Sequence, residues 1–194
     1  QPATPVYLDS PMGNAATNIY THYPQDFNDH MQGELSGDGP FTFSGLVTIR
    51  NARKSAAIKR QIGPKVIIAG SGMMTGGRII AHAADFLPIP TTRLLIVGWQ
   101  GEDTLGRELQ AGARVVHIDK KSIQVRGTVH DTQAMSSHAD QGQLLSWLGA
   151  IRGVKKVFLT HGDDIPRAVL AKKIREEHRI SDVVMPVMHQ EISF

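Results

Sequence analysis

The chain has 194 residues, of which 41% are hydrophobic and 20% are charged, and 21 basic against 18 acidic residues leave a formal net charge of +3. This composition is typical of a folded globular protein, and the absence of cysteine excludes disulfides, cysteine-ligated zinc, iron–sulfur clusters and thiol nucleophiles. No apolar run approaches the ~20 residues of a membrane span, and residues 1–5 lack the features of a secretion signal. We therefore expect a cytoplasmic protein with no membrane partner.

The first part of the chain predicts short alternating strands and helices. Residues Phe27–Pro40 are polar and glycine-rich, which predicts a surface loop. The other predicted elements are a strand at Val6–Asp9, a helix at Ala15–Tyr23, a strand at Leu46–Ile49 and a basic helix at Ala52–Gln61 that ends before Gly63 and Pro64.

A glycine-rich turn follows the β-branched run Val66–Ala69, and a helix with apolar residues at helical spacing follows the turn at Arg78–Phe86. A second buried strand is predicted at Leu94–Gly98, with a helix at Thr104–Gln110. Strands whose apolar residues do not alternate, separated by helices, favour a parallel sheet covered on both faces.

The pattern changes after Gly112. Residues 114–118 and 123–129 alternate around a polar turn and predict a hairpin. The elements predicted after it are a helix at Asp140–Ile151, a strand at Lys156–Thr160, a helix at Ile165–Arg179 and a strand at Val183–Met185. The sequence thus predicts an α/β fold, with a domain boundary that divides the chain into residues 1–112 and 113–194.

The turn at residues 70–77 is the first candidate site. Glycines between a strand and a helix let backbone N–H groups approach an anion, and the helix start adds a positive dipole. A P-loop would need Gly-Lys-Ser/Thr where Gly77-Arg78 stands, and Gly70, Gly72 and Gly76 are spaced one residue too long for a dinucleotide fingerprint. A turn with only a packing role stays open beside an anion site.

Two histidines occupy matching positions, each between a strand and the following helix. His138 and His161 therefore stand out from the other seven histidines, for which a surface or capping role is the default interpretation. Neighbouring strands would bring both imidazoles to one edge of a sheet. Two histidines do not make a zinc site, because catalytic zinc takes at least three protein ligands. No serine is placed as in a nucleophile elbow.

Five short segments follow one another through most of the chain. They are Pro5–Met12, Gly70–Arg78, Gly101–Arg107, Ser136–Asp140 and Leu159–Asp163. Together they resemble the β-CASP branch of the metallo-β-lactamase superfamily, which contains RNA-processing nucleases. The resemblance implies a β-CASP-like parallel-sheet domain, followed by a hairpin and αβ units from the C-terminal part of a metallo-β-lactamase fold.

The resemblance also implies roles for individual residues. His138 matches the histidine that lies at the scissile phosphate, and His161 matches a ligand of one of two zinc ions. The residues that fall where the family holds RNA phosphates are Ser136, Ser137, Gly70, Ser71, Gly72, Thr75, Gly76 and Gly77. In such a site, two metal ions activate a water molecule and stabilise the charge that develops during phosphodiester hydrolysis.

The family's H-x-H-x-D-H motif and its other metal ligands belong to an N-terminal lactamase half and do not occur in this sequence. We therefore expect the chain to be the C-terminal half of a zinc-dependent ribonuclease, to retain no zinc and to be inactive alone. Its expected partners are RNA, the missing half and a second copy of itself in a homodimer. The alternatives are a non-catalytic RNA-binding or dimerisation module and, less favoured, a nucleotide-binding domain that uses the Gly70 turn.

Overall fold

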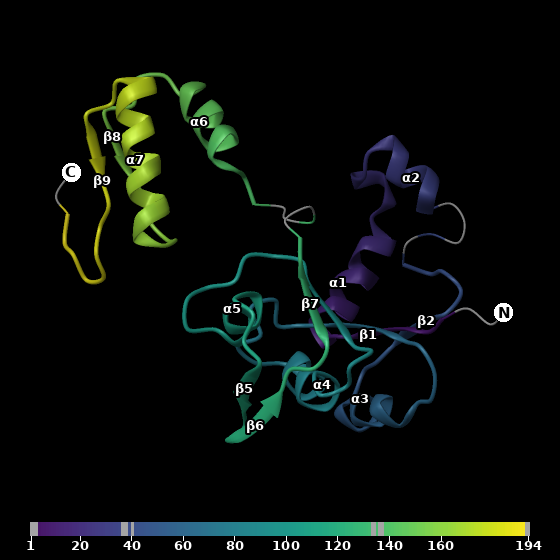
Figure 1. Ribbon diagram of the computed structural model, residues 1–194. Helices are drawn as coiled ribbons and strands as arrows, with labels where there is room; N and C mark the ends of the chain where they lie inside the picture. Colours follow the sequence, from purple (N-terminus) through teal and green to yellow (C-terminus); the bar gives the residue numbers. More distant parts are fainter. Residues whose placement is uncertain (1–3, 36–38, 40, 133–134, 136–137, 193–194) are drawn as a thin grey trace. The chain divides into compact units, whose positions relative to one another are not determined.

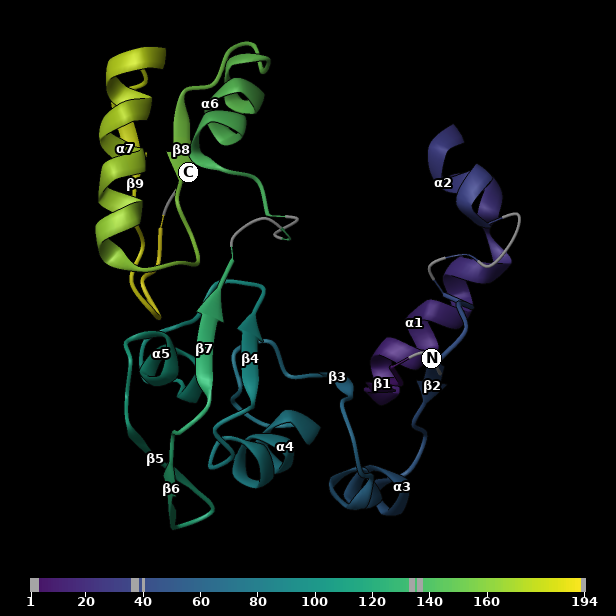
Figure 2. The ribbon, with the colours of Figure 1, turned by 45° about the vertical axis from the view of Figure 1, so that its right-hand side comes forward.

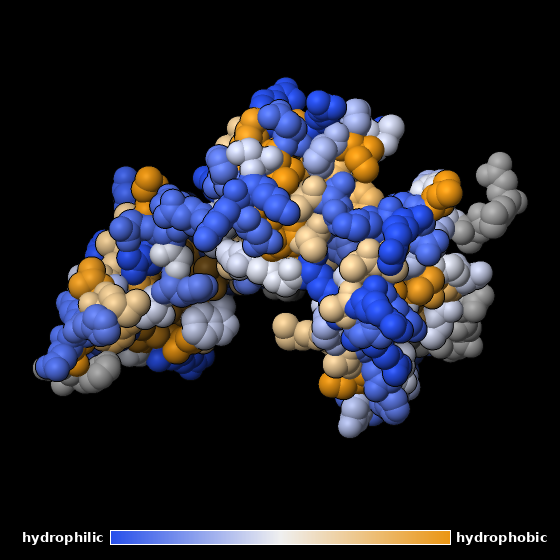
Figure 3. Space-filling model, turned by 90° about the horizontal axis from the view of Figure 1, so that it is seen from below, coloured by the Kyte–Doolittle hydropathy of each residue, from blue (hydrophilic) through white to orange (hydrophobic). Residues whose placement is uncertain are grey.

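The computed structural model describes residues 4–35, 39, 41–132, 135 and 138–192. The chain forms two compact units, residues 1–136 and 137–194 (Figures 1 and 2). Hydrophilic side chains cover much of the face seen from below, with hydrophobic ones between them (Figure 3). No helix in the described part of the chain is long and apolar enough to cross a membrane.

A three-stranded parallel sheet opens the first unit, with the strand order β2-β1-β3. Its strands are β1 (Val6–Asp9), β2 (Leu46–Thr48) and β3 (Val66–Ala69). The central strand β1 pairs through Val6 with Leu46 on one side and with Val66 on the other. Because all three strands run in one direction, their carboxyl ends meet at one edge of the sheet. The three predicted strands are confirmed within one residue.

Helices follow these strands. They are α1 (Pro11–His22), η1 (Pro24–Asp26), α2 (Asp29–Leu35), α3 (Ala52–Ala57), η2 (Ile58–Arg60), α4 (Arg78–Phe86) and α5 (Leu105–Gln110). Helix α1 begins four residues before its predicted start, because Ser10 Oγ accepts a hydrogen bond from Gly13 N (3.1 Å) and Pro11 occupies the first helical position.

The predicted surface loop at residues 27–40 is wrong for Asp29–Leu35, which form α2. Asn28 Oδ1 accepts a hydrogen bond from Met31 N (2.9 Å) just before this helix. Asp29 adds a negative charge to the first turn. Capping and charge thus start a short helix despite the polar, glycine-containing composition.

Strand β4 (Arg93–Ile96) pairs in parallel with β7 (Thr128–Asp131), and a hairpin of β5 (Val115–Ile118) and β6 (Lys121–Gln124) lies between them in sequence. Asp119 and Lys120 form the hairpin turn, and both have positive φ (47° and 63°), as the type I′ two-residue turn requires. The predicted second arm at residues 123–129 is wrong in one respect. It divides between β6 and β7, because Thr128 and Val129 find partners in β4.

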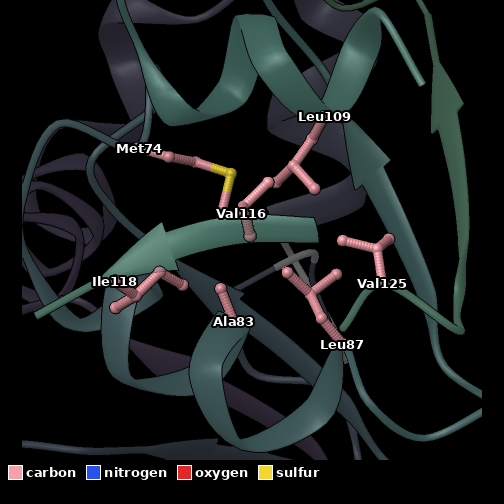
Figure 4. Close-up of a cluster of buried hydrophobic side chains, with 7 residues drawn as sticks. All are labelled: Met74, Ala83, Leu87, Leu109, Val116, Ile118 and Val125. Carbon is pink, nitrogen blue, oxygen red and sulfur yellow. The ribbon is translucent and has the colours of Figure 1, made fainter. Parts of the chain in front are cut away.

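The core of the first unit joins the glycine-rich turn, α4, α5 and the hairpin. Its buried side chains, seen in Figure 4, are Met74, Ala83, Leu87, Leu109, Val116, Ile118 and Val125. Leu109 and Val116 are fully inaccessible to solvent. The hairpin therefore packs into the same unit as the glycine-rich turn, and Met74 anchors that turn in the core.

The second unit contains α6 (Gln141–Gly149), β8 (Lys156–Phe158), α7 (Asp164–His178) and β9 (Asp182–Val184), with β8 and β9 parallel. All four elements match predictions to within two residues. The core is small and consists of Leu145, Leu148, Ala171, Ile174 and Val183. Large apolar side chains remain exposed on this unit, among them Trp147 and Ile165.

Candidate functional site

The glycine-rich turn leaves the carboxyl end of β3 and leads into α4. Ile79 N donates a hydrogen bond to Gly70 O (3.1 Å), so the first turn of α4 closes back onto the end of the strand. Within the turn, Met74 N donates to Ser71 O (3.1 Å), and the hydroxyls of Ser71 and Thr75 lie 3.2 Å apart. These contacts within the turn fix its conformation, and the buried side chain of Met74 anchors it in the core of the first unit.

The glycines of this turn differ in what requires them. Gly77 has φ +72°, and a Cβ there would lie 2.5 Å from Gly70 O, so only glycine fits. At Gly72 and Gly76, by contrast, a Cβ would meet nothing within 4 Å, and neither residue has a positive φ. Packing and backbone geometry do not demand glycine at these two positions. Their missing side chains leave open backbone surface, which an anion could approach.

A second helix starts at the same sheet edge. Ser10 directly follows β1 and caps α1, and a Cβ on Gly70 would lie 3.6 Å from Ser10 Oγ. The amino ends of α1 and α4 therefore both lie at the carboxyl ends of the paired strands β1 and β3. Because helix amino ends carry partial positive charge, this edge favours a negatively charged ligand.

A buried carboxylate supports this edge, and no sequence pattern assigns it a role. Asp9 ends β1, is fully buried and accepts hydrogen bonds from Ser55 Oγ and from the guanidinium of Arg78, while His82 Nε2 lies 2.7 Å from its Oδ2. Arg78 and His82 lie on α4 and Ser55 lies on α3. Asp9 thus ties two helices to the central strand, directly behind the glycine-rich turn.

The charge state of Asp9 follows from these contacts. Burial by itself raises the pKa of the Asp9 carboxyl. The hydrogen bonds from Ser55, His82 and Arg78, together with the positive charge of Arg78, outweigh burial, so the pKa lies below its ordinary value. Asp9 is therefore ionised at neutral pH. The signals in the sequence are an acidic residue at the end of an apolar strand and the place of Asp9 in the segment Pro5–Met12.

Gln100 is a second residue that sequence patterns do not single out. Its side chain is buried, and Nε2 donates to Gly72 O (3.0 Å) and to Gly98 O (2.9 Å). It thereby joins the glycine-rich turn to the loop after β4. Gly106 makes room for it, since a Cβ there would fall 1.6 Å from Gln100 Oε1. Gln100 and Asp9 hold the turn from two sides.

The two predicted histidines lie in the second unit, and both are exposed. His138 precedes Asp140, whose side chain accepts from Gln143 N (2.8 Å) while Gln143 Oε1 accepts from Asp140 N (2.8 Å), a capping box that begins α6. The neighbouring predictions, Ser136 and Ser137, lie outside the described residues.

His161 lies between β8 and α7 and has a positive φ of 63°, which is uncommon for a residue with a side chain. Arg167 on α7 donates to Leu159 O (3.4 Å) and to Pro186 O (3.2 Å), and so braces the segment that carries His161. Backbone strain that is held in place by neighbours is frequent at functional positions.

The strands that precede the two histidines pair within different units. Strand β7 pairs with β4 in the first unit, whereas β8 pairs with β9 in the second. That His138 and His161 act at one site stays a prediction.

The described residues contain no group of three or more His, Asp or Glu side chains that could hold a metal ion. Among the described residues, His161 therefore belongs to no such group, and these residues do not complete a zinc site, which takes at least three protein ligands. No catalytic step is assigned to a metal ion held by this chain alone.

Comparison with known proteins connects the glycine-rich turn to a family. The family model described as "Beta-Casp domain" matches residues 1–109, more than half of the chain. The chain belongs to the β-CASP family. A second family model, described as "Zn-dependent metallo-hydrolase RNA specificity domain", matches residues 122–186. The β-CASP match contains the whole glycine-rich turn, and the second match contains His138 and His161.

Three relatives illustrate the similarity of this β-CASP chain to known proteins. Ribonuclease TTHA0252 of Thermus thermophilus is 37% identical over 172 residues, which cover 88% of this chain and 39% of the relative. Transcription termination factor FttA of Thermococcus kodakarensis is 31% identical, with 91% of this chain and 28% of the relative covered. An RNase J-like protein of Methanocaldococcus jannaschii is 29% identical, with 82% and 36% covered. The chain thus spans roughly a third of the length of these relatives.

Proposed function

We propose that this chain is the RNA-binding part of a metal-dependent ribonuclease and that RNA phosphates bind at the glycine-rich turn. The observation that carries the proposal is the open backbone surface at Gly72 and Gly76, located where α1 and α4 begin. Phosphate is the anion that strand–glycine turn–helix sites most often bind. The β-CASP family match and the ribonuclease and termination-factor names of the relatives support RNA as the source of the phosphate.

In this proposal, each predicted residue keeps its role. His138 acts at the scissile phosphate, His161 is a metal ligand, and Ser136 and Ser137 contact RNA phosphates. Ser71, Thr75 and the glycines of the turn hold further phosphates of the same strand. The β-CASP domain spans residues 1–112, and residues 113–194 are the end of a lactamase-type fold. A cytoplasmic location is part of the same proposal.

The first test places a negative charge in the turn. In Gly72→Asp the new Cβ meets no atom within 4 Å, so we expect the fold to be kept while the carboxylate repels RNA phosphates. We expect single-stranded RNA to bind about tenfold more weakly, measured by fluorescence anisotropy. Gly33→Asp in α2 is the matched control, because it adds the same charge at another open glycine. Equal affinities of the two variants would contradict a phosphate site at the turn.

Catalysis is proposed to require zinc ligands from a lactamase half that is not in this sequence. The exposed Trp147 and Ile165 of the second unit support a surface for that half or for a second copy of the chain. We expect the chain to bind RNA equally with zinc or with a chelator, and to leave the RNA uncut on a denaturing gel. Zinc-dependent cleavage that disappears in His138→Ala would refute the dependence on a missing half.

A second function is that of a non-catalytic RNA-binding module. The described residues contain no group of three or more His, Asp or Glu side chains that could hold a metal ion, which is compatible with this function as well. The two functions differ in what happens when a lactamase half is supplied. Cleavage restored by mixing the two chains, and lost in His138→Ala, supports the ribonuclease part. RNA binding without any restored cleavage supports the module.

A further inference from the structure

The positive charge of the chain is concentrated in one stretch of the first unit. Residues 39–84 contain no aspartate or glutamate. The lysines and arginines in the same stretch are Arg50, Arg53, Lys54, Lys59, Arg60, Lys65 and Arg78. The net charge of the whole chain is only +3, so this stretch differs sharply from the rest.

Three of these seven cations already have partners. Arg78 is paired with the buried Asp9, Lys59 Nζ lies 3.1 Å from Asp85 Oδ1, and Lys65 Nζ lies 5.5 Å from the centre of the Phe86 ring. The other four are exposed, and no ion pair between described residues involves them. We call these four, Arg50, Arg53, Lys54 and Arg60, the α3 basic surface.

Three residues of the α3 basic surface lie in one short helical segment, because α3 continues directly into η2, and Arg50 directly precedes the cap Asn51. Asn51 caps its start by accepting a hydrogen bond from Lys54 N (2.9 Å), and Ser55 joins it to the buried Asp9. The four charges are thus carried by a segment that is anchored to the fold.

This segment also touches the start of α4. The guanidinium of Arg78 donates to Asn51 O (3.4 Å) and to Arg50 O (3.5 Å) at the start of α3. Arg78 directly follows the glycine-rich turn. A single side chain therefore connects the turn to the first residue of the α3 basic surface, and both lie in the same compact unit.

The geometry points to a second phosphate-binding surface: the backbone of a single-stranded RNA held at the glycine-rich turn continues across α3 and contacts the α3 basic surface. This inference rests on the proposed function. Exposed cations that take part in no ion pair recognise a polyanion by charge, and they do so without regard to base sequence. The surface therefore increases the affinity for RNA and lengthens the stretch of RNA that is bound. It does not contribute to the recognition of base sequence.

The test compares two double variants that remove the same charge. Arg53→Gln/Lys54→Gln removes two unpaired cations from α3. Lys172→Gln/Lys173→Gln removes two cations from α7 that already pair with Glu176 and Glu177 (3.8 and 3.3 Å). Each is titrated with a labelled single-stranded RNA of about 12 nucleotides, within the site sizes of single-strand binders. The affinities are measured over a range of salt concentrations.

We expect the α3 variant to bind about tenfold more weakly than the native chain at about 50 mM salt, and the slope of log affinity against log salt to become shallower by about 1.4, or about 0.7 for each lost phosphate contact. The α7 variant keeps the native affinity and slope. Arg60→Gln, a single change outside the first turn of α3, weakens binding in the same direction if folding of the double variant is impaired.

Equal binding by the α3 and α7 variants would overturn the inference. If Gly72→Asp still weakens RNA binding in that case, the proposed function survives and only the second surface is lost. If the native chain binds no RNA at any salt concentration, the proposed function itself fails. Loss of RNA binding in both double variants would assign the effect to net charge and would also overturn a specific α3 surface.

Discussion

Replacing Asp9 with asparagine is expected to lower the free energy of unfolding of the first unit by about 3–5 kcal/mol. Asp9 is fully buried and binds Arg78, His82 and Ser55. Asparagine keeps the volume but leaves the Arg78 guanidinium without its counter-charge, and a buried charge that loses its partner costs far more than a surface pair contributes. The helices α3 and α4 lose their common attachment to β1.

The chain allows this prediction to be measured in one unit at a time. It contains two tryptophans, Trp99 in the first unit and Trp147 in the second. In a Trp147→Phe background, urea unfolding followed by fluorescence reports on the first unit through Trp99. Asp85→Asn is the matched control, because Asp85 pairs with Lys59 at a partly exposed position and should cost about 0–1 kcal/mol. Similar losses in both variants would contradict a structural role for the Asp9 cluster.

The effect of Asp9→Asn also depends on pH in a definite direction. Because the pKa of Asp9 is lower in the folded than in the unfolded chain, its stabilisation is present above the unfolded value of about 3.9 and is lost as the pH falls through the folded value. The difference between native chain and variant should be constant near neutral pH and shrink in acid. A difference that persists at the lowest pH where the unit folds would contradict the lowered pKa.

Replacing Gly77 with alanine is the second change with a large expected effect, about 3 kcal/mol on the first unit together with weaker RNA binding. The new Cβ would lie 2.5 Å from Gly70 O and 2.9 Å from Ser71 N, and both are backbone atoms that cannot rotate away. The positive φ of 72° adds strain for any residue with a side chain. The turn must therefore open where α4 begins.

Gly76→Ala is the control one residue earlier. A Cβ at Gly76 meets no atom within 4 Å, and its φ is not positive, so the expected change in stability is within about 0.5 kcal/mol. Both variants are compared by urea unfolding in the Trp147→Phe background and by RNA anisotropy. If Gly77→Ala were as stable as Gly76→Ala, the backbone contact between Gly77 and Gly70 O would not limit this position.

Local signals predicted much of the fold. The strand Val66–Ala69, the turn and the helix Arg78–Phe86 follow from β-branched residues, glycines and helical spacing within a few residues of one another. The capping box at Asp140 is equally local. Helix α2 was not predicted although its capping residue, Asn28, is also local, because the polar and glycine-rich composition of residues 27–40 is typical of a surface loop.

Pairing across long sequence distances could not be predicted in the same way. The partner of β7 is β4, which precedes the hairpin in the sequence. The alternation of residues 123–129 is equally compatible with one long hairpin arm, so the sequence pattern does not separate β6 from β7. The contacts of Asp9 reach Ser55, Arg78 and His82, which are 46, 69 and 73 residues away. No periodicity links such positions, because they meet only after three strands have paired and two helices have packed.

The sequence by itself determined the α/β class, the β-CASP family through its ordered motifs, and the candidate residues at the turn and in the two histidine loops. Only the tertiary structure decided which glycines of the turn are required by packing and which leave open backbone. It also decided that Asp9 and Gln100 hold the turn in place and that Arg78, which follows the turn, joins it to the segment that carries four cations outside the described ion pairs. The physical reason is that a motif consists of residues that are close together in the sequence. Burial, charge pairing and steric fit depend instead on residues that are distant in the sequence and that folding brings together.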